Sequence, residues 1–322
     1  MITELATGNR QSAIAYLFPG QGSQYPGMGK NLADNFPAAR KVFEEVDEAL
    51  GIPLSRLCFE GPAEELQLTE NTQPAILTAS IAAIRAMEAN GFPPAAFVAG
   101  HSLGEYSALV AAGSISLSDA AKTVRARGRY MQEAVPVGTG AMAAVMGAEI
   151  GAIERVCAEA SGNQICAPAN INSSNQVVIA GNAEAVERAM DLMKGIGAKR
   201  GIKLNVSAPF HCALMRPAQE RLRVDLQQLA FADPKVPVVT NVDALARTSP
   251  GELRDALIRQ VSAPVRWLES MELLIQQGAT TFVEVGPGKV LSGLMRQISR
   301  EVNCLNVEDA ASLNATREKL TA

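Results

Sequence analysis

The segment with the clearest chemical meaning is Gly100-His101-Ser102-Leu103-Gly104, which has the Gly-x-Ser-x-Gly pattern of a nucleophile elbow. In such an elbow a serine sits on a strained strand-to-helix turn with its hydroxyl exposed. A serine hydroxyl needs a base, and histidine is the usual base near neutral pH. The chain has only two histidines, and His101 should point away from the serine, so His211 is the expected base. The alternative is a connection whose serine merely caps a helix.

Acyl transfer at a serine also requires two hydrogen-bond donors for the oxygen that becomes negative. In an elbow, one donor is the backbone N–H of the residue after the nucleophile, here Leu103. The second comes from a loop after an earlier strand, and the turn Gly20-Gln21-Gly22 is the best candidate because glycines permit close backbone approach. An ordinary glycine turn would have the same sequence.

Arg127 is a charged residue in an apolar place. It lies on the apolar stripe of the helix expected over residues 117–133, whereas Arg125 and Arg129 lie on the opposite side. A buried guanidinium must have a partner, and a carboxylate is its strongest one. The pattern therefore suggests that Arg127 binds a carboxylate of the substrate, with an internal salt bridge to Asp or Glu as the alternative. The stripe consists of Ala120, Val124, Gly128 and Met131.

The elements that would hold these residues alternate between strands and helices. A short apolar run at 95–99 precedes the elbow, and a helix at 105–112, ended by Gly113, follows it. This alternation predicts an α/β protein. The other expected elements before residue 137 are a strand at 14–18 and helices at 38–49, 73–90 and 117–133.

Between residues 138 and 207 the order changes to β-α-β-β-α-β, which is the ferredoxin-like order. The sequence thus predicts a large domain of residues 1–137 and 208–322, with a small domain of residues 138–207 inserted into it. Ser102 and His211 would then meet where the two domains join, a common place for a substrate cleft. The expected strands are 141–147, 165–172, 176–180 and 203–207, and the helices are 150–160 and 183–196.

Composition narrows the class of protein. The 322 residues include 29 basic and 33 acidic side chains, which gives a net charge of −4 and no indication of nucleic-acid binding. The first ten residues do not resemble a secretory signal, and no apolar run approaches membrane-spanning length, so we expect a cytoplasmic protein without a membrane association. Five scattered cysteines without Cys-x-x-Cys spacing indicate neither a disulfide framework nor a zinc site, and two histidines argue against any metal site.

Taken together, five motifs resemble the malonyl-CoA:acyl carrier protein transacylase family. The resemblance runs in order over nearly the whole chain and implies a hydrolase-like large domain with a parallel sheet and a ferredoxin-like insert. The motifs are Phe18-Pro19-Gly20-Gln21-Gly22-Ser23-Gln24, Gly100-His101-Ser102-Leu103-Gly104-Glu105-Tyr106, Gly138-Thr139-Gly140-Ala141-Met142, Gln176-Val177-Val178-Ile179-Ala180-Gly181 and Val285-Gly286-Pro287-Gly288.

The resemblance also implies an activity, namely two-step transfer of malonyl from malonyl-CoA to an acyl carrier protein through a malonyl-serine ester, in fatty-acid biosynthesis and without a cofactor. Ser102 and His211 would form the catalytic dyad, and the amides of Gln21 and Leu103 would form the oxyanion hole. Arg127 would bind the malonyl carboxylate. The backbone carbonyl of Gln260 would orient the histidine.

Two positions bear on how far the resemblance extends. Ala263 stands where the family often has asparagine before Pro264-Val265, so the role of that side chain is missing or filled elsewhere. Phe210, before the histidine, is similar to the residue at that position in malonyl-selective members of the family.

A cluster of basic residues has two interpretations. Lys194, Lys199, Arg200 and Lys203 could contact an acidic carrier protein, or could form a solvated helix end and loop.

Other functions remain open from the sequence. A discrete acyltransferase of a polyketide synthase would share every motif. A serine hydrolase or thioesterase would share the elbow, the dyad and the oxyanion hole, but would release free acid and would not need a buried arginine. A non-catalytic docking subunit could keep the fold alone, although retention of Ser102, His211, Gln21 and Arg127 argues against it. The tail from about Val307 onward is predicted to be a helix without an assigned role.

Overall fold

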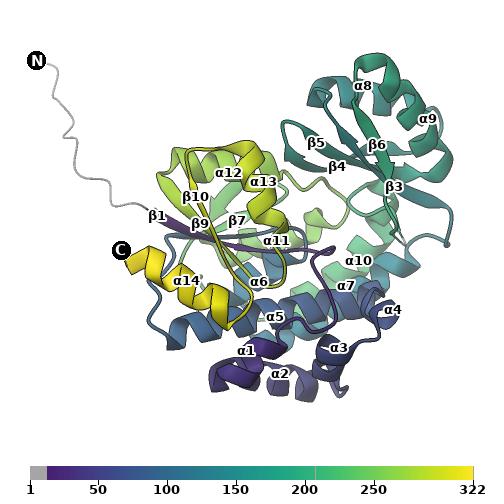
Figure 1. Ribbon diagram of the computed structural model, residues 1–322. Helices are drawn as coiled ribbons and strands as arrows, with labels where there is room; N and C mark the ends of the chain where they lie inside the picture. Colours follow the sequence, from purple (N-terminus) through teal and green to yellow (C-terminus); the bar gives the residue numbers. More distant parts are fainter. Residues whose placement is uncertain (1–12, 207, 322) are drawn as a thin grey trace, which may run out of the picture.

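The computed structural model describes residues 13–206 and 208–321, which are arranged around two β-sheets (Figure 1). The larger sheet has six strands in the order β10-β9-β1-β2-β7-β8. All neighbouring pairs are parallel except β7 with β8, which is antiparallel. The strands are β1 (Ala13–Phe18), β2 (Phe97–Gly100), β7 (Val238–Thr240), β8 (Leu245–Arg247), β9 (Ala279–Val285) and β10 (Asn303–Val307).

Helices cover both faces of this sheet. Tyr16 and Phe18 of β1 belong to one hydrophobic cluster, with α2, α5, α6, α7 and α10, whereas Ala15 and Leu17 belong to another, with α12 and α13. Because successive side chains of a strand point to opposite faces, β1 is buried on both sides, as parallel strands are. The helices are α1 (Lys30–Asn35), α2 (Pro37–Leu50), α3 (Leu54–Glu60), α4 (Ala63–Leu66), α5 (Thr69–Ala89), α6 (Gly104–Ala111), α7 (Leu117–Glu133), α10 (Arg216–Gln228), α11 (Pro250–Gln260), α12 (Trp267–Gln276), α13 (Val290–Ile298) and α14 (Ala310–Thr321).

The smaller sheet is antiparallel, with the order β4-β5-β3-β6, and two helices pack on one of its faces. Its other face contributes Met142 and Val178 to the main hydrophobic cluster, so that face packs toward the larger sheet. This is the ferredoxin-like arrangement expected from the sequence. The elements are β3 (Gly140–Met146), α8 (Ile150–Ser161), β4 (Cys166–Ser173), β5 (Gln176–Asn182), α9 (Ala183–Met193), a short 3-10 helix (Lys194–Ile196) and β6 (Arg200–Lys203).

The last expected strand, 203–207, was wrong. The strand is Arg200–Lys203, residues 204–206 are not in a strand, and residue 207 lies outside the described residues. The apolar character of Leu204 and Val206 has a different cause, because both side chains line a cavity between the two sheets.

The smaller sheet is also joined to the segment that precedes α12. A parallel bridge between Asn170 and Val265, with Val265 N–H donating to the carbonyl of Ala169 at 2.9 Å, fastens the smaller sheet to the segment before α12. The predicted tail helix is present as α14. No helix in residues 13–206 and 208–321 has both the length and the apolar character needed to cross a membrane.

Candidate active site

The elbow is a strained turn that only glycines on either side permit. Ser102 has a φ of 54°, the left-handed region that L-residues seldom adopt. A Cβ on Gly100 would lie 1.9 Å from the backbone of Gly104, and a Cβ on Gly104 would lie 2.2 Å from the carbonyl oxygen of Phe18. Gly100 thus lets β2 approach α6, and Gly104 lets α6 approach β1, which holds the serine in the turn between β2 and α6.

Ser102 and His211 lie close together in the structure. In the sequence, Ser102 precedes the strands of the smaller sheet and His211 follows them. Oγ of Ser102 lies 2.7 Å from Nε2 of His211, and Nδ1 of His211 lies 2.9 Å from the backbone carbonyl oxygen of Gln260. A carbonyl can only accept, so Nδ1 carries the proton and Nε2 is the acceptor. The serine hydroxyl therefore donates to His211, which is the direction required of a nucleophile and its base.

The electrostatics keep this imidazole neutral. Burial, followed by the positive charge of Arg127, lowers the pKa of His211 to about 3, against the opposing effect of its hydrogen bond to the Gln260 carbonyl. The resting histidine is accordingly neutral near pH 7, and its Nε2 carries no proton.

His101 is placed apart from this pair, as the elbow geometry predicted. Its Nε2 lies 2.9 Å from Oδ1 of Asn172, and its ring packs at a tilt against Trp267. Burial lowers its pKa. Its ring therefore contacts the smaller sheet and α12, and it lines the same cavity as Ser102 and His211.

Arg127 is 1% exposed, and it forms no ion pair with any Asp or Glu of the described residues. Nη1 donates to Oε1 of Gln73 at 2.7 Å, and Nη2 donates to Oε1 of Gln260 at 2.9 Å and to Oγ of Ser102 at 3.1 Å. The internal salt bridge considered from the sequence is thus not found. The guanidinium instead has neutral partners and reaches the nucleophile directly.

Two buried residues that the sequence analysis missed hold the elbow. Oδ1 of Asn241 accepts the Ser102 N–H at 2.7 Å, and its Nδ2 donates to the Gly100 carbonyl at 2.7 Å. Oε2 of Glu105 accepts from the Asn241 N–H and from Nε2 of Gln260, both at 2.9 Å. Burial raises the pKa of Glu105 to about 7. The available signal was an acidic residue in the first turn of an otherwise apolar helix.

The donors proposed for an oxyanion flank Ser102. Leu103 follows it, and the loop that carries Gln21 packs against the elbow, where a Cβ on Gly20 would lie 2.5 Å from the carbonyl oxygen of His101. Gln21 also lines the cavity that contains Ser102. No described residue accepts a hydrogen bond from the N–H of Gln21 or Leu103.

This cavity lies between the two sheets. Apolar side chains from helices, strands and loops close it. Its polar lining consists of Gln21, Gln73, His101, Ser102, Arg127, Asn170 and His211. Its apolar lining consists of Met131, Met142, Leu204, Val206 and Phe210. Within the described part of the chain, no group of three or more His, Cys, Asp or Glu side chains could hold a metal ion.

The basic residues named from the sequence lie along α9, the 3-10 helix and β6. Lys194 pairs with Asp191, and Lys203 pairs with Glu187, both at 2.8 Å. Lys199 and Arg200 complete the set at the start of β6.

Comparison with known proteins matches this arrangement to one family. The family described as acyl transferase domain matches residues 15–321. The chain is 50% identical over 311 residues to the malonyl CoA-acyl carrier protein transacylase of Bacillus subtilis (strain 168), covering 96% of this chain and 98% of that protein. It is 49% identical over 305 residues to the protein of the same name from Escherichia coli (strain K12), covering 95% and 99%.

Solved structures agree. The malonyl CoA-acyl carrier protein transacylase of Coxiella burnetii superposes with a TM-score of 0.95 at 43% identity, covering 97% of this chain and 98% of that one. A malonyl-transacylase in complex with its type II PKS acyl-carrier protein superposes with a TM-score of 0.94 at 48% identity, covering 96% and 100%.

Proposed function

Because this chain belongs to the acyl transferase family, we propose that it is a malonyl-CoA:acyl carrier protein transacylase. The observation that carries the proposal is the buried guanidinium of Arg127, which has no acidic partner among the described residues and lies beside the Ser102–His211 pair. A cation held there suits an acyl group that ends in a carboxylate, as malonyl does. The relatives' names point to the same substrate and carrier.

In the first half-reaction, Oγ of Ser102 attacks the thioester carbonyl of malonyl-CoA while Nε2 of His211 takes the hydroxyl proton. The amides of Gln21 and Leu103 donate to the negative oxygen of the tetrahedral intermediate. The C–S bond then breaks, and His211 returns the proton to the departing thiolate of coenzyme A. A malonyl ester on Ser102 remains.

The second half-reaction reverses these steps with a different thiol. The phosphopantetheine thiol of the carrier protein loses its proton to His211, and its sulfur attacks the ester carbonyl. The C–O bond breaks, Ser102 recovers the proton from His211, and malonyl leaves on the carrier. No cofactor takes part, since both thioesters are substrates.

Arg127 would act on the acyl group rather than on the thiol. When the ester forms, Oγ of Ser102 becomes a weaker acceptor for Nη2, and the malonyl carboxylate can accept from both Nη atoms in a bidentate pair. Holding the acyl group in one pose favours the incoming thiol over water. Phe210, which lines the cavity, supports selection of malonyl over bulkier acyl groups.

Four further predictions from the sequence are part of the proposal, and they concern the domains, the location, the pathway and the carrier-binding surface. We divide the chain into a catalytic domain of residues 1–137 and 208–322 and an inserted domain of residues 138–207. We place the protein in the cytoplasm and in fatty-acid biosynthesis, with a polyketide acyl carrier protein as the alternative acceptor. Lys194, Lys199, Arg200 and Lys203 are the candidates for contact with an acidic carrier, with a solvated helix end and loop as the alternative.

Intact mass after brief exposure to malonyl-CoA tests the reaction. Wild-type protein should gain one malonyl group, Ser102→Ala should gain none, and added carrier protein should remove the group by taking it up. Free malonate without uptake by the carrier would instead identify a hydrolase or thioesterase. If neither an adduct nor a product forms, the chain is a docking subunit and the proposal fails.

A further inference from the structure

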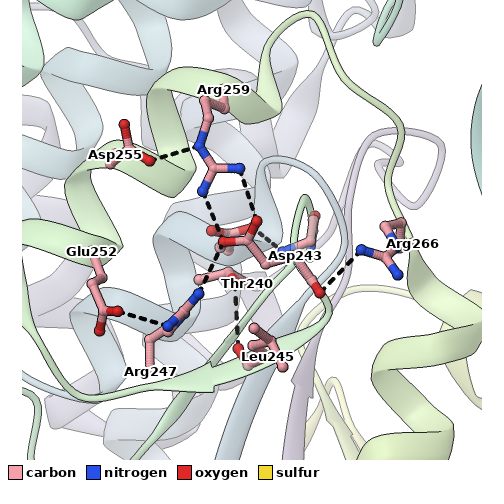
Figure 2. Close-up of polar contacts among 10 residues, drawn as sticks. Thr240, Asp243, Leu245, Arg247, Glu252, Asp255, Arg259 and Arg266 are labelled. Carbon is pink, nitrogen blue, oxygen red and sulfur yellow. Dashed lines mark hydrogen bonds and ion pairs between the residues drawn. The ribbon is translucent and has the colours of Figure 1, made fainter.

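A cluster of charged residues lies at the turn between β7 and β8 (Figure 2). At its centre, Asp243 accepts two hydrogen bonds from Arg259, from Nη1 to Oδ1 and from Nη2 to Oδ2, each at 2.8 Å. Arg247 lies 3.6 Å from the same carboxylate. The Arg259–Asp243 pair joins the β7–β8 turn to the last turn of α11.

Both ends of this pair are close in sequence to residues of the site. Asp243 is two residues after Asn241, whose side chain holds the backbone of Ser102 and Gly100. Arg259 immediately precedes Gln260, whose carbonyl holds His211 and whose side chain holds Arg127. The ion pair therefore connects the segment that holds the nucleophile to the segment that holds the base.

The same two segments are joined a second time inside the protein. Nε2 of Gln260 lies 3.3 Å from Oδ1 of Asn241, and Glu105 accepts from both residues. This inner link consists of uncharged amides around one carboxylate, whose hydrogen bonds allow some change of angle. A bidentate guanidinium–carboxylate pair restricts both distance and orientation.

The turn that carries Asp243 is itself held tightly. Ala244 has a φ of 52°, and its N–H donates to the carbonyl of Thr240 at 2.9 Å. Arg266 donates from Nη1 to the carbonyl of Asp243 at 3.2 Å and from its backbone N–H to the carbonyl of Asn241 at 3.0 Å. These hydrogen bonds fix the backbone of the turn, so a displacement of Asp243 should also displace Asn241.

Partial exposure limits what this pair can contribute to stability. The side chains of Arg259 and Asp243 are 39% and 19% exposed, and ion pairs with this much solvent contact contribute little net free energy. Arg259 holds the pKa of Asp243 below its usual value, so the carboxylate stays ionised near neutral pH. The main effect of the Arg259–Asp243 pair should therefore be on the relative position of the two segments that it joins.

We infer that Asp243 and Arg259 are positioning residues, which hold Asn241 and Gln260 at the separation that aligns Ser102 with His211. This rests on the proposed function. Neither residue lines the cavity or contacts Ser102, His211 or Arg127. Small displacements of reacting groups can lower a rate greatly, so a slight loosening of this pair should be visible in the chemical step.

The test is a double-mutant cycle on the first half-reaction, with Asp243→Asn, Arg259→Gln and the double variant. Asp255→Asn is the matched control, because Asp255 also pairs with Arg259, at 2.6 Å, but lies on α11 and does not reach the turn. We expect each single variant to lower the rate of malonyl-serine formation about tenfold at saturating malonyl-CoA, with KM changed less than about twofold. The double variant should be no slower than the slower single, and the control should match wild type.

Arg259→Lys serves as a second probe if a neutral variant folds poorly, since it keeps the charge but loses the bidentate geometry, and it should also be slowed. Thermal unfolding of each variant shows whether the protein is folded at the assay temperature. Wild-type rates throughout, additive effects in the cycle, or equal slowing by Asp255→Asn would overturn the inference. Failure of the wild-type protein to form any acyl-serine would instead overturn the proposed function.

Discussion

Nη2 of Arg127 lies 3.1 Å from Oγ of Ser102, so the candidate carboxylate-binding group contacts the candidate nucleophile directly. Oγ accepts a hydrogen bond from the guanidinium and donates its own proton to Nε2 of His211, which lies 2.7 Å from Oγ. Oγ of Ser102 is thus hydrogen-bonded to both His211 and Arg127. Acylation converts that oxygen to an ester, which leaves the guanidinium available for the acyl carboxylate.

Arg127→Ala should separate malonyl from acetyl transfer. Loss of a charged bidentate pair removes about 3 kcal/mol of binding, so kcat/KM for malonyl-CoA should fall by about two orders of magnitude or more. Acetyl-CoA has no carboxylate and should lose much less. Arg125→Ala and Arg129→Ala, on the same helix, are the controls and should leave both substrates unaffected. Equal losses for malonyl and acetyl would show that Arg127 acts only on the fold or on Ser102.

The pH profile should lack the inflection of an ordinary histidine. With its pKa lowered to about 3, His211 is already neutral at pH 5, so kcat/KM for the first half-reaction should not fall between pH 7.5 and 5.5 through a group near 6.5. Burial is the larger cause of the low value and the charge of Arg127 the second, so Arg127→Ala should raise the pKa of His211, measured with acetyl-CoA.

The titration of Glu105 must be distinguished from that of His211 in that experiment, because the pKa of Glu105, about 7, lies within the pH range of the profile. Repeating the profile with Glu105→Gln removes that group. A wild-type midpoint near 6.5 that survives in Glu105→Gln would mean that the imidazole is not shielded as the structure indicates.

Asn241→Ala should destabilise the protein and slow acylation together. The substitution leaves the Ser102 N–H and the Gly100 carbonyl without their partner, at a cost of about 2 kcal/mol or more in the free energy of unfolding. The strained Ser102 backbone then has less to hold it, and we expect a rate about tenfold lower. Asn303→Ala, on the exposed side of β10, is the control for denaturant unfolding and stopped-flow acylation. Unchanged unfolding in Asn241→Ala would contradict the role assigned to its side chain.

Gly100→Ala and Gly104→Ala should each prevent correct folding or lower Tm by many degrees. The added methyl group would lie 1.9 Å from the backbone of Gly104 in the first variant and 2.2 Å from the carbonyl oxygen of Phe18 in the second. These atoms cannot move without separating α6 from β2 or from β1, respectively. Gly293→Ala is the matched control, since its Cβ meets no atom within 4 Å and it lies within α13. That variant should be neutral or slightly stabilised. A folded, active Gly100→Ala would disprove the steric requirement.

Much of the architecture could be predicted from periodicity and from Gly-rich turns. The helix expected over 117–133 is α7, with the same bounds, because its Ser116 cap and its apolar stripe are both local features. The β-α-β-β-α-β order of the insert is confirmed by the strand order of the smaller sheet. The error at 203–207 came from treating Leu204 and Val206 as strand residues, because an apolar run has the same pattern whether it faces a sheet or a cavity.

The sequence by itself determined the α/β class, the elbow at Ser102, the choice of His211 between two histidines, and the position of Arg127 on a buried helix face. These depend on residue type, scarcity and short-range spacing. Only the tertiary structure decided that Arg127 has Gln73 and Gln260 as partners in place of an acidic residue, and that Asn241 and Glu105 hold the elbow. Those contacts join residues separated by 54 to 139 positions. Hydrogen bonds act over about 3 Å in space, so chain separation carries no information about them until the fold has formed.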